Sequence, residues 1–143
     1  MLRLYGCKVS CLLDAARMSK AVLILDYLPQ SEMQYVDVNV ASLLAAWNHV
    51  CVPSKVVSAI CAGTPVLYNA NEESEGACMF PEAVWLLPDS ENRAIAVRQF
   101  LDHVSPDAIS RKREAARKYA GEMIRIERAG LQSLLDILKC EVG

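Results

Sequence analysis

Five short apolar runs constrain the fold of this chain more than any other feature. They cover residues 2–5, 21–25, 37–43, 65–68 and 83–87. None alternates cleanly between apolar and polar residues, as a strand with one face in water does. We therefore predict strands that are buried on both faces, as in a parallel sheet covered by helices.

Segments with helical spacing separate these runs. We predict helices over residues 9–18, 32–35, 54–62 and 74–80. Ser31 and Ser54 each stand where a serine caps a helix start, and Gly63 stands where glycine ends one. Thr64 precedes a proline, which favours extended backbone and the start of the next strand. Strands alternating with helices predict an α/β chain.

From Asp89 onward the apolar runs give way to helical periodicity. We predict one helix over residues 90–103 and another that begins at Ser105, which serves as its cap before Pro106. Apolar residues then recur at helical spacing as far as Leu138. We expect this tail to pack on the sheet or on a partner. The chain is thus predicted to be a single domain, with βα units over residues 1–88 and a helical tail over residues 89–143.

Composition limits the classes of function. The chain has 143 residues, 53% of them hydrophobic and 22% charged, and no apolar run approaches the length that spans a bilayer. Its net charge is −2, and no lysine or arginine occurs between Lys55 and Arg93, which disfavours a nucleic-acid-binding surface. Six cysteines form no C-x-x-C pair and no charged leader precedes an apolar stretch, so we expect a cytoplasmic chain without zinc.

Residues 52–66 contain a helix start, a helix stop and a buried strand in direct succession. Free backbone N–H groups at the helix start, beside Ser54 and Lys55, would suit an anionic ligand such as a diphosphate. Every βαβ unit also needs a helix start and stop for structural reasons alone. On physical grounds alone, the structural interpretation is favoured.

The same segment resembles the Pro-Ser-Lys…Ala-Gly-x-Pro-Val signature of many bacterial GT-B glycosyltransferases. It reads Pro53-Ser54-Lys55 and then Ala62-Gly63-Thr64-Pro65-Val66. The signature belongs to the C-terminal, nucleotide-sugar-binding domain of these group 1, family 4-like enzymes, which make capsule, lipopolysaccharide and related surface glycans. Residues 22–33, 37–43 and 68–77 are similar to neighbouring elements of that domain, in the same order. The resemblance implies a Rossmann-like three-layer fold, with about five parallel strands and helices on both faces.

The resemblance also implies where a donor nucleotide sugar would bind. In the family it lies at the carboxyl edge of the sheet, as is general for open parallel sheets. Ser54 and Lys55 would lie near the donor phosphates, and Tyr27 and Leu28 near the base. The residues at matching positions are Tyr27, Leu28, Ser54, Lys55, Ser58, Gly63, Thr64 and Glu75. Of these, Gly63 and Thr64 would shape the pocket floor, and Glu75 would begin a helix at its rim.

Two departures from the family pattern narrow this expectation. Ser58 stands where many members have a glutamate that holds ribose hydroxyls. The strand that normally opens the domain, and the acceptor-binding domain before it, have no counterpart in the sequence. We expect a donor-binding part that does not complete glycosyl transfer alone and uses no metal or cofactor. The alternative is a degenerate, non-catalytic module that binds a partner, with a second copy or an N-terminal domain covering the open sheet edge.

Several other residues admit a functional or a structural interpretation. His49 and Trp47 precede the Pro-Ser-Lys segment and would approach a ligand there, but an isolated loop histidine is more often incidental. The acidic residues Glu72, Glu73 and Glu75 are interpreted as a solvated loop rather than a metal site. Cys7 and Cys11 are interpreted as ordinary thiols, since no histidine or second cysteine pair accompanies them. At most a peripheral association with membranes is expected.

Overall fold

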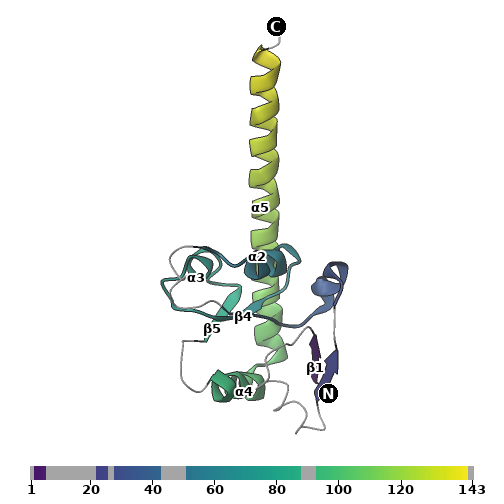
Figure 1. Cartoon of the computed structure of the whole chain (residues 1–143), viewed down its shortest axis with the longest axis vertical. Coiled ribbons are helices and arrows are strands. Elements are labelled where there is room, and N and C mark those ends of the chain that lie inside the picture. The colour runs from purple at the N-terminus through teal and green to yellow at the C-terminus, as the bar shows by residue number, and fades with distance from the viewer. Residues whose placement is uncertain (1, 6–21, 26–27, 43–50, 88–92, 142–143) are drawn as a thin grey trace.

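The computed structural model describes residues 2–5, 22–25, 28–42, 51–87 and 93–141 (Figure 1). Its elements are β1 (Leu2–Tyr5), β2 (Val22–Leu25), the 3-10 helix η1 (Gln30–Tyr35), β3 (Asn39–Ser42), α2 (Ser54–Cys61), β4 (Val66–Asn69), α3 (Glu75–Met79), β5 (Val84–Leu87), α4 (Arg93–His103) and α5 (Pro106–Glu141). Each predicted strand is present within one or two residues of its predicted start. The predicted helix over residues 9–18 lies outside the described residues.

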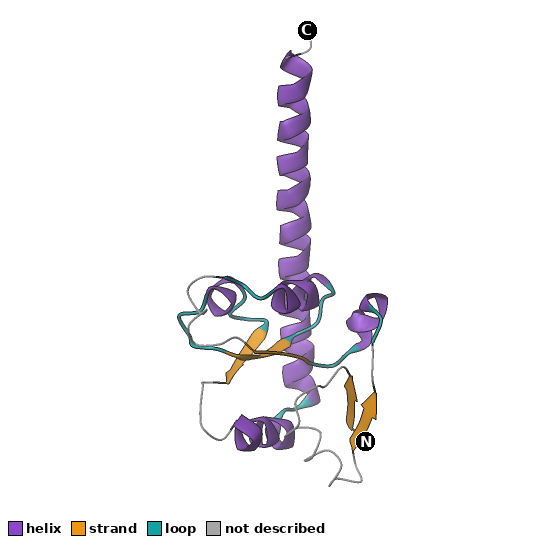
Figure 2. Ribbon diagram, viewed as in Figure 1, coloured by secondary structure: helices purple, strands orange, loops and turns teal. Residues whose placement is uncertain are grey.

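All strand pairs among the described residues are parallel. β1 pairs with β2, and β3, β4 and β5 form a three-stranded sheet in that order. The predicted α/β class and the parallel pairing are confirmed. The five strands form two separate sheets, however, and Figure 2 shows the β1–β2 pair apart from the other three strands.

The central strand β4 is buried over its whole length. Val66 and Tyr68 face the core cluster that includes Val56 and Ile60 of α2. Leu67 faces the other way, as alternation along a strand requires, and is paired in register with Trp85 of β5. The Trp85 ring makes an edge-to-face contact with Phe100 of α4, with a centroid separation of 5.1 Å. Accordingly, α2 and α3 lie on one side of this sheet and α4 on the other (Figure 2).

A Schellman motif ends α2. The N–H of Thr64 donates to the carbonyl of Ala59 at 3.0 Å, and the N–H of Gly63 donates to that of Ile60 at 2.8 Å. Gly63 has a φ of 70°, in the left-handed region that favours glycine. A Cβ atom at Gly63 would lie 2.8 Å from Cγ of Arg117 in α5. The predicted stop at Gly63 is therefore confirmed, and it also allows α5 to pass close by.

The predicted serine caps are only partly correct. Ser105 accepts a hydrogen bond from the N–H of Ala108 at 3.1 Å, and thus caps α5 as predicted. Ser54 is instead the first residue of α2, with Pro53 as N-cap and no side-chain cap. Likewise, Pro29 precedes η1, so Ser31 lies inside that helix. In both cases the proline, with φ near −60°, takes the position before the helix and leaves the serine one or two residues too late.

α5 is a single helix of 36 residues that runs through Gly121 and Gly130. Its first half covers the core: Ala116 and Ala120 are buried, and the ring of Tyr119 contacts that of Phe80 edge to face. Beyond Met123 the helix leaves the body and projects alone (Figure 1). The sequence predicted a helical tail, but not its continuity or its projection.

Two adjacent cations fix α5 to opposite edges of the three-stranded sheet. Nζ of Lys112 donates to the carbonyls of Val84 at 2.6 Å and Glu82 at 3.2 Å, and lies 5.3 Å from the centre of the Trp85 ring. The guanidinium of Arg113 donates to the carbonyls of Gln34 at 2.9 Å and Val36 at 2.8 Å. Burial lowers the pKa of Lys112, an effect that the nearby charge of Glu82 partly offsets.

No helix among the described residues is both long enough and apolar enough to cross a bilayer.

Replacing Gly63 with alanine tests the turn between α2 and β4. Gly63→Ala adds a Cβ at a positive φ and against Arg117, so we expect it to lower the free energy of unfolding by about 1–3 kcal/mol. Gly121→Ala is the matched control, since no atom lies within 4 Å of the added Cβ, and should raise it by about 0.5–1 kcal/mol. Urea unfolding monitored by circular dichroism measures both. Equal effects of the two changes would contradict this account of Gly63.

Candidate functional site

The carboxyl edge of the three-stranded sheet is held together by Asn69, the last residue of β4. Its side-chain oxygen accepts a hydrogen bond from the hydroxyl of Ser42 at 3.1 Å, and its side-chain nitrogen donates to the carbonyl of Leu87 at 2.9 Å. Ser42 and Leu87 are the last residues of β3 and β5. One buried amide thus joins the ends of all three strands and fixes their spacing at this edge.

The start of α2 lies at the same edge, because α2 precedes the parallel strand β4 and runs antiparallel to it. Ser54 and Lys55 occupy its first two positions, and both side chains are exposed. Helix geometry leaves their two N–H groups without an acceptor inside the helix, whereas the N–H of Val56 donates to the carbonyl of Pro53 at 2.9 Å. Two backbone donors and one ammonium group are therefore available to an anion here.

Two buried hydroxyl groups lie near the same edge of the sheet. Tyr68 of β4 and Ser74, the N-cap residue of α3, are both fully buried. Neither hydroxyl has a well-directed hydrogen-bond partner among the described residues. The ring of Tyr68 lies under α3, where a Cβ atom at Gly76 would approach its edge to 3.0 Å. Buried polar groups are nearly always hydrogen-bonded, and the two hydroxyls are close enough for Ser74 to influence the electrostatics of the phenol.

The electrostatics of Tyr68 connect it to the segment that leads into α2. Burial raises the pKa of the Tyr68 phenol; the hydroxyl of Ser74 lowers it, and an electrostatic contribution from Cys51 raises it further. Ser74 is thus close to the phenol although the two form no well-directed hydrogen bond. The phenol therefore keeps its proton at neutral pH, and its O–H group can donate a hydrogen bond.

The structure divides the predicted site residues between the two edges of the sheet. Ser54, Lys55 and Glu75 lie at the carboxyl edge, and half-buried Ser58 is one turn into α2. Gly63 and Thr64 follow the end of α2 and precede β4, so they lie at the opposite, amino edge. An eight-residue helix is about 12 Å long, and this length separates the two groups.

Leu28 is half-buried in the loop before η1. Tyr27, Trp47 and His49 lie outside the described residues.

The hydroxyl of Thr64 makes hydrogen bonds within the protein at the amino edge of the sheet. It donates to the carbonyl of Ala59 at 2.9 Å and accepts from the side-chain amide of Asn39 at 2.7 Å. The N–H of Asn39 donates to the carbonyl of Pro65 at 2.9 Å. These bonds connect the end of α2 to the start of β3. The fold alone therefore accounts for glycine at position 63 and threonine at position 64.

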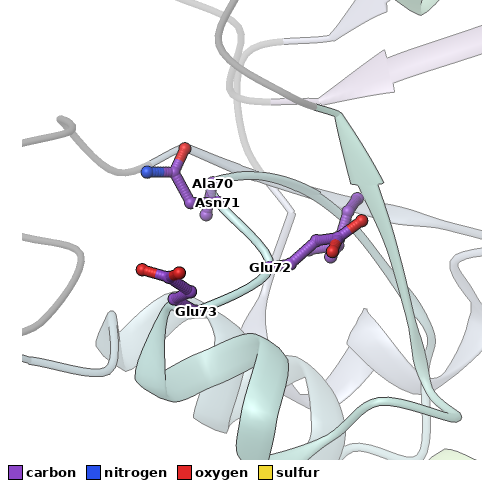
Figure 3. A pocket seen from close by; sticks show the side chains of 5 residues that line it. Ala70, Asn71, Glu72 and Glu73 are labelled. Carbon is purple, nitrogen blue, oxygen red and sulfur yellow. The ribbon is translucent and has the colours of Figure 1, made fainter.

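An open pocket of about 450 Å³ lies next to the site, on the α3 side of the carboxyl edge. It is lined by Ala70, Asn71, Glu72, Glu73 and Leu86 (Figure 3). The carboxylates of Glu72 and Glu73 point in opposite directions (Figure 3). Two carboxylates repel a negatively charged phosphate, but they accept hydrogen bonds from hydroxyl groups. Across the described ranges, no group of three or more histidine, cysteine or acidic side chains is arranged to hold a metal ion.

Sequence reasoning missed three members of this site. Tyr68 and Asn69 are polar residues at the end of an otherwise apolar buried strand, and Ser74 immediately precedes the predicted rim residue Glu75. The position of the polar pair at a strand end was a usable signal, because parallel strands end at one common edge. The proximity of Ser74 to Tyr68 had no sequence signal, since it depends on how α3 folds back over β4.

No family model, curated protein or solved structure was found to match this chain.

Removing the Tyr68 hydroxyl tests whether this group makes a hydrogen bond in the folded protein. Tyr68→Phe keeps the ring and its packing under α3 but removes a buried polar atom, so we expect the free energy of unfolding to stay the same or rise by up to about 1 kcal/mol. Chemical denaturation of the ligand-free protein measures it. Tyr35→Phe, at a side chain that is 77% exposed, is the matched control and should have no effect. A loss of more than about 1 kcal/mol for Tyr68→Phe alone would show that its hydroxyl is already hydrogen-bonded.

Proposed function

We propose that this chain is the donor-binding part of a glycosyltransferase and holds a nucleoside-diphosphate sugar at the carboxyl edge of β3, β4 and β5. The observation that carries the proposal is that the exposed start of α2, with Lys55, lies at the same edge of the sheet as the pocket lined by Asn71 and Glu72. The order of the glycosyltransferase-like segments along the chain supports it independently. A donor-binding edge is also where open parallel sheets generally bind ligands.

The two halves of the proposed site differ in charge. The diphosphate would accept hydrogen bonds from the backbone N–H groups at the start of α2 and pair with the ammonium of Lys55. The open pocket beside it carries the carboxylate of Glu72 and the amide of Asn71, which suit the hydroxyls of a sugar or ribose. A nucleoside-diphosphate sugar combines an anionic centre with hydroxyl-rich ends, and this arrangement favours it over a simple phosphate.

The chain by itself supplies no acceptor site in this proposal. A Rossmann-like domain of three layers and about five strands would be completed around the described elements, and an acceptor-binding domain would close over the donor. The reaction would belong to surface-glycan synthesis, on the cytoplasmic side of the membrane where nucleotide sugars are available. Ser58 would approach the ribose with a hydroxyl in place of a carboxylate, at a half-buried position on α2.

One observation favours the second candidate, a degenerate module that retains the fold without binding a donor. Ser58 stands where the resemblance places a glutamate, and α2 carries no acidic side chain that could take over its role. Direct binding measurements separate the two candidates.

Calorimetric titration with UDP-, GDP- and dTDP-sugars tests the proposal. We expect at least one to bind, and Lys55→Ala to weaken that binding about tenfold or more, because a charge-assisted hydrogen bond to phosphate is lost. Lys118→Ala, which removes a cation from the exposed surface of α5, is the matched control and should leave affinity unchanged. If none of these ligands binds a folded chain, the donor-binding proposal is wrong and the degenerate module stands.

A further inference from the structure

The projecting half of α5 carries an unpartnered apolar stripe. The stripe consists of Ile124, Leu131, Leu134, Leu135 and Leu138, each between 48% and 55% exposed. At 100° per residue, these five side chains fall within an arc of about 100° on the helix. The opposite side is mostly polar and includes Lys118, Glu122, Arg125 and Asp136, with Ile126 and Ile137 as exposed apolar exceptions there and on its flank. The exposed half of α5 is therefore an amphipathic helix whose apolar face is uncovered.

The stripe continues the face by which α5 packs on the body. Ala116, Ala120 and Met123 contact or approach the core on that face. The core ends at Met123, but the apolar pattern continues for about 15 more residues, or some 22 Å of helix. Because this face is a packing surface for the first half of the helix, its apolar continuation indicates packing in the second half as well.

Spacing within the stripe points to a helical partner. Ile124, Leu131 and Leu138 are seven residues apart, and Leu134 lies three residues after Leu131. This is the a and d spacing by which one helix packs lengthwise along another. A second copy of the chain offers a helix with the same stripe and the same length. Two copies would remove on the order of 1,000 Å² of surface from water, near the lower limit for a specific interface.

Charge within the stripe selects the direction of pairing. Glu127 is the one charged residue on the apolar face between Ile124 and Leu131. Parallel helices would place the two Glu127 side chains against each other, which is destabilising. In antiparallel helices with Leu131 opposite Leu134, each Glu127 lies opposite Leu138 of the partner instead. Antiparallel pairing therefore keeps the two Glu127 carboxylates apart.

We propose that two copies of this chain associate through the projecting halves of α5, packed antiparallel along the Ile124–Leu138 stripe. A membrane surface is a poorer occupant, because residues 121–141 carry three basic and four acidic residues, whereas surface-binding helices are rich in lysine and arginine. The proposal does not depend on the donor-binding function. Its consequence is a dimer in which the two bodies lie at opposite ends of the helix pair.

Sedimentation equilibrium of the full chain tests the interface. We expect a monomer–dimer equilibrium, and Leu134→Glu should raise the dimer dissociation constant at least about tenfold, since it buries a charge in the seam. Ala129→Glu introduces the same residue on the opposite side of the helix and should not change it. Circular dichroism checks that both variants fold. A wild-type chain that is monomeric at about 100 µM would overturn the proposal. Flotation of that monomer with neutral or anionic vesicles would assign the stripe to a membrane surface instead.

Mixing tagged wild-type chain with a Glu127→Lys variant tests the direction of pairing. Antiparallel helices keep the two copies of residue 127 apart, so mixed and like dimers should form in statistical proportion. Preferential formation of the mixed dimer would show that the two residues face each other, and would overturn the antiparallel arrangement.

Discussion

Burial of β4 on both faces is the constraint on which the rest of the structure depends. A strand with four consecutive buried residues needs a cover on each side and a neighbouring strand at each edge. Ile60 of α2 and Ala116 of α5 supply the cover on one side, whereas Trp85 and Phe100 pack on the other. β3 and β5 supply the edges. The carboxyl edge with its joined strand ends exists only because this packing brings three strand ends together.

α5 holds the outer strands of this sheet at fixed positions. Lys112 and Arg113 are adjacent in sequence, so their side chains leave the helix about 100° apart and reach different elements. One satisfies backbone carbonyls at the start of β5 and the other satisfies those before β3. Both use charge-assisted hydrogen bonds, which are stronger than neutral ones. The helix thereby fixes the separation of the two outer strands at the amino edge, as Asn69 does at the carboxyl edge.

Local patterns predicted the elements better than their arrangement. The positions of the strands followed from apolar runs, and the end of α2 followed from Gly63, because both depend on residues near in sequence. The assignment of Ser54 as a cap was wrong because Pro53 takes that position. The sequence placed Gly63 and Thr64 in the same site as Ser54, but the length of α2 separates them. The apposition of Tyr68 and Ser74 depends on the path of the chain after β4, which no local pattern encodes.

The amide of Asn69 has a consequence for how this edge can change during evolution. Both polar atoms of its side chain are occupied by the neighbouring strands, so the spacing of the strand ends is set from within the sheet. The loop that follows β4 is then not required to hold the edge together. Substitutions and insertions in that loop can accumulate without altering the scaffold, so that its sequence can diverge while the sheet beneath it stays constant.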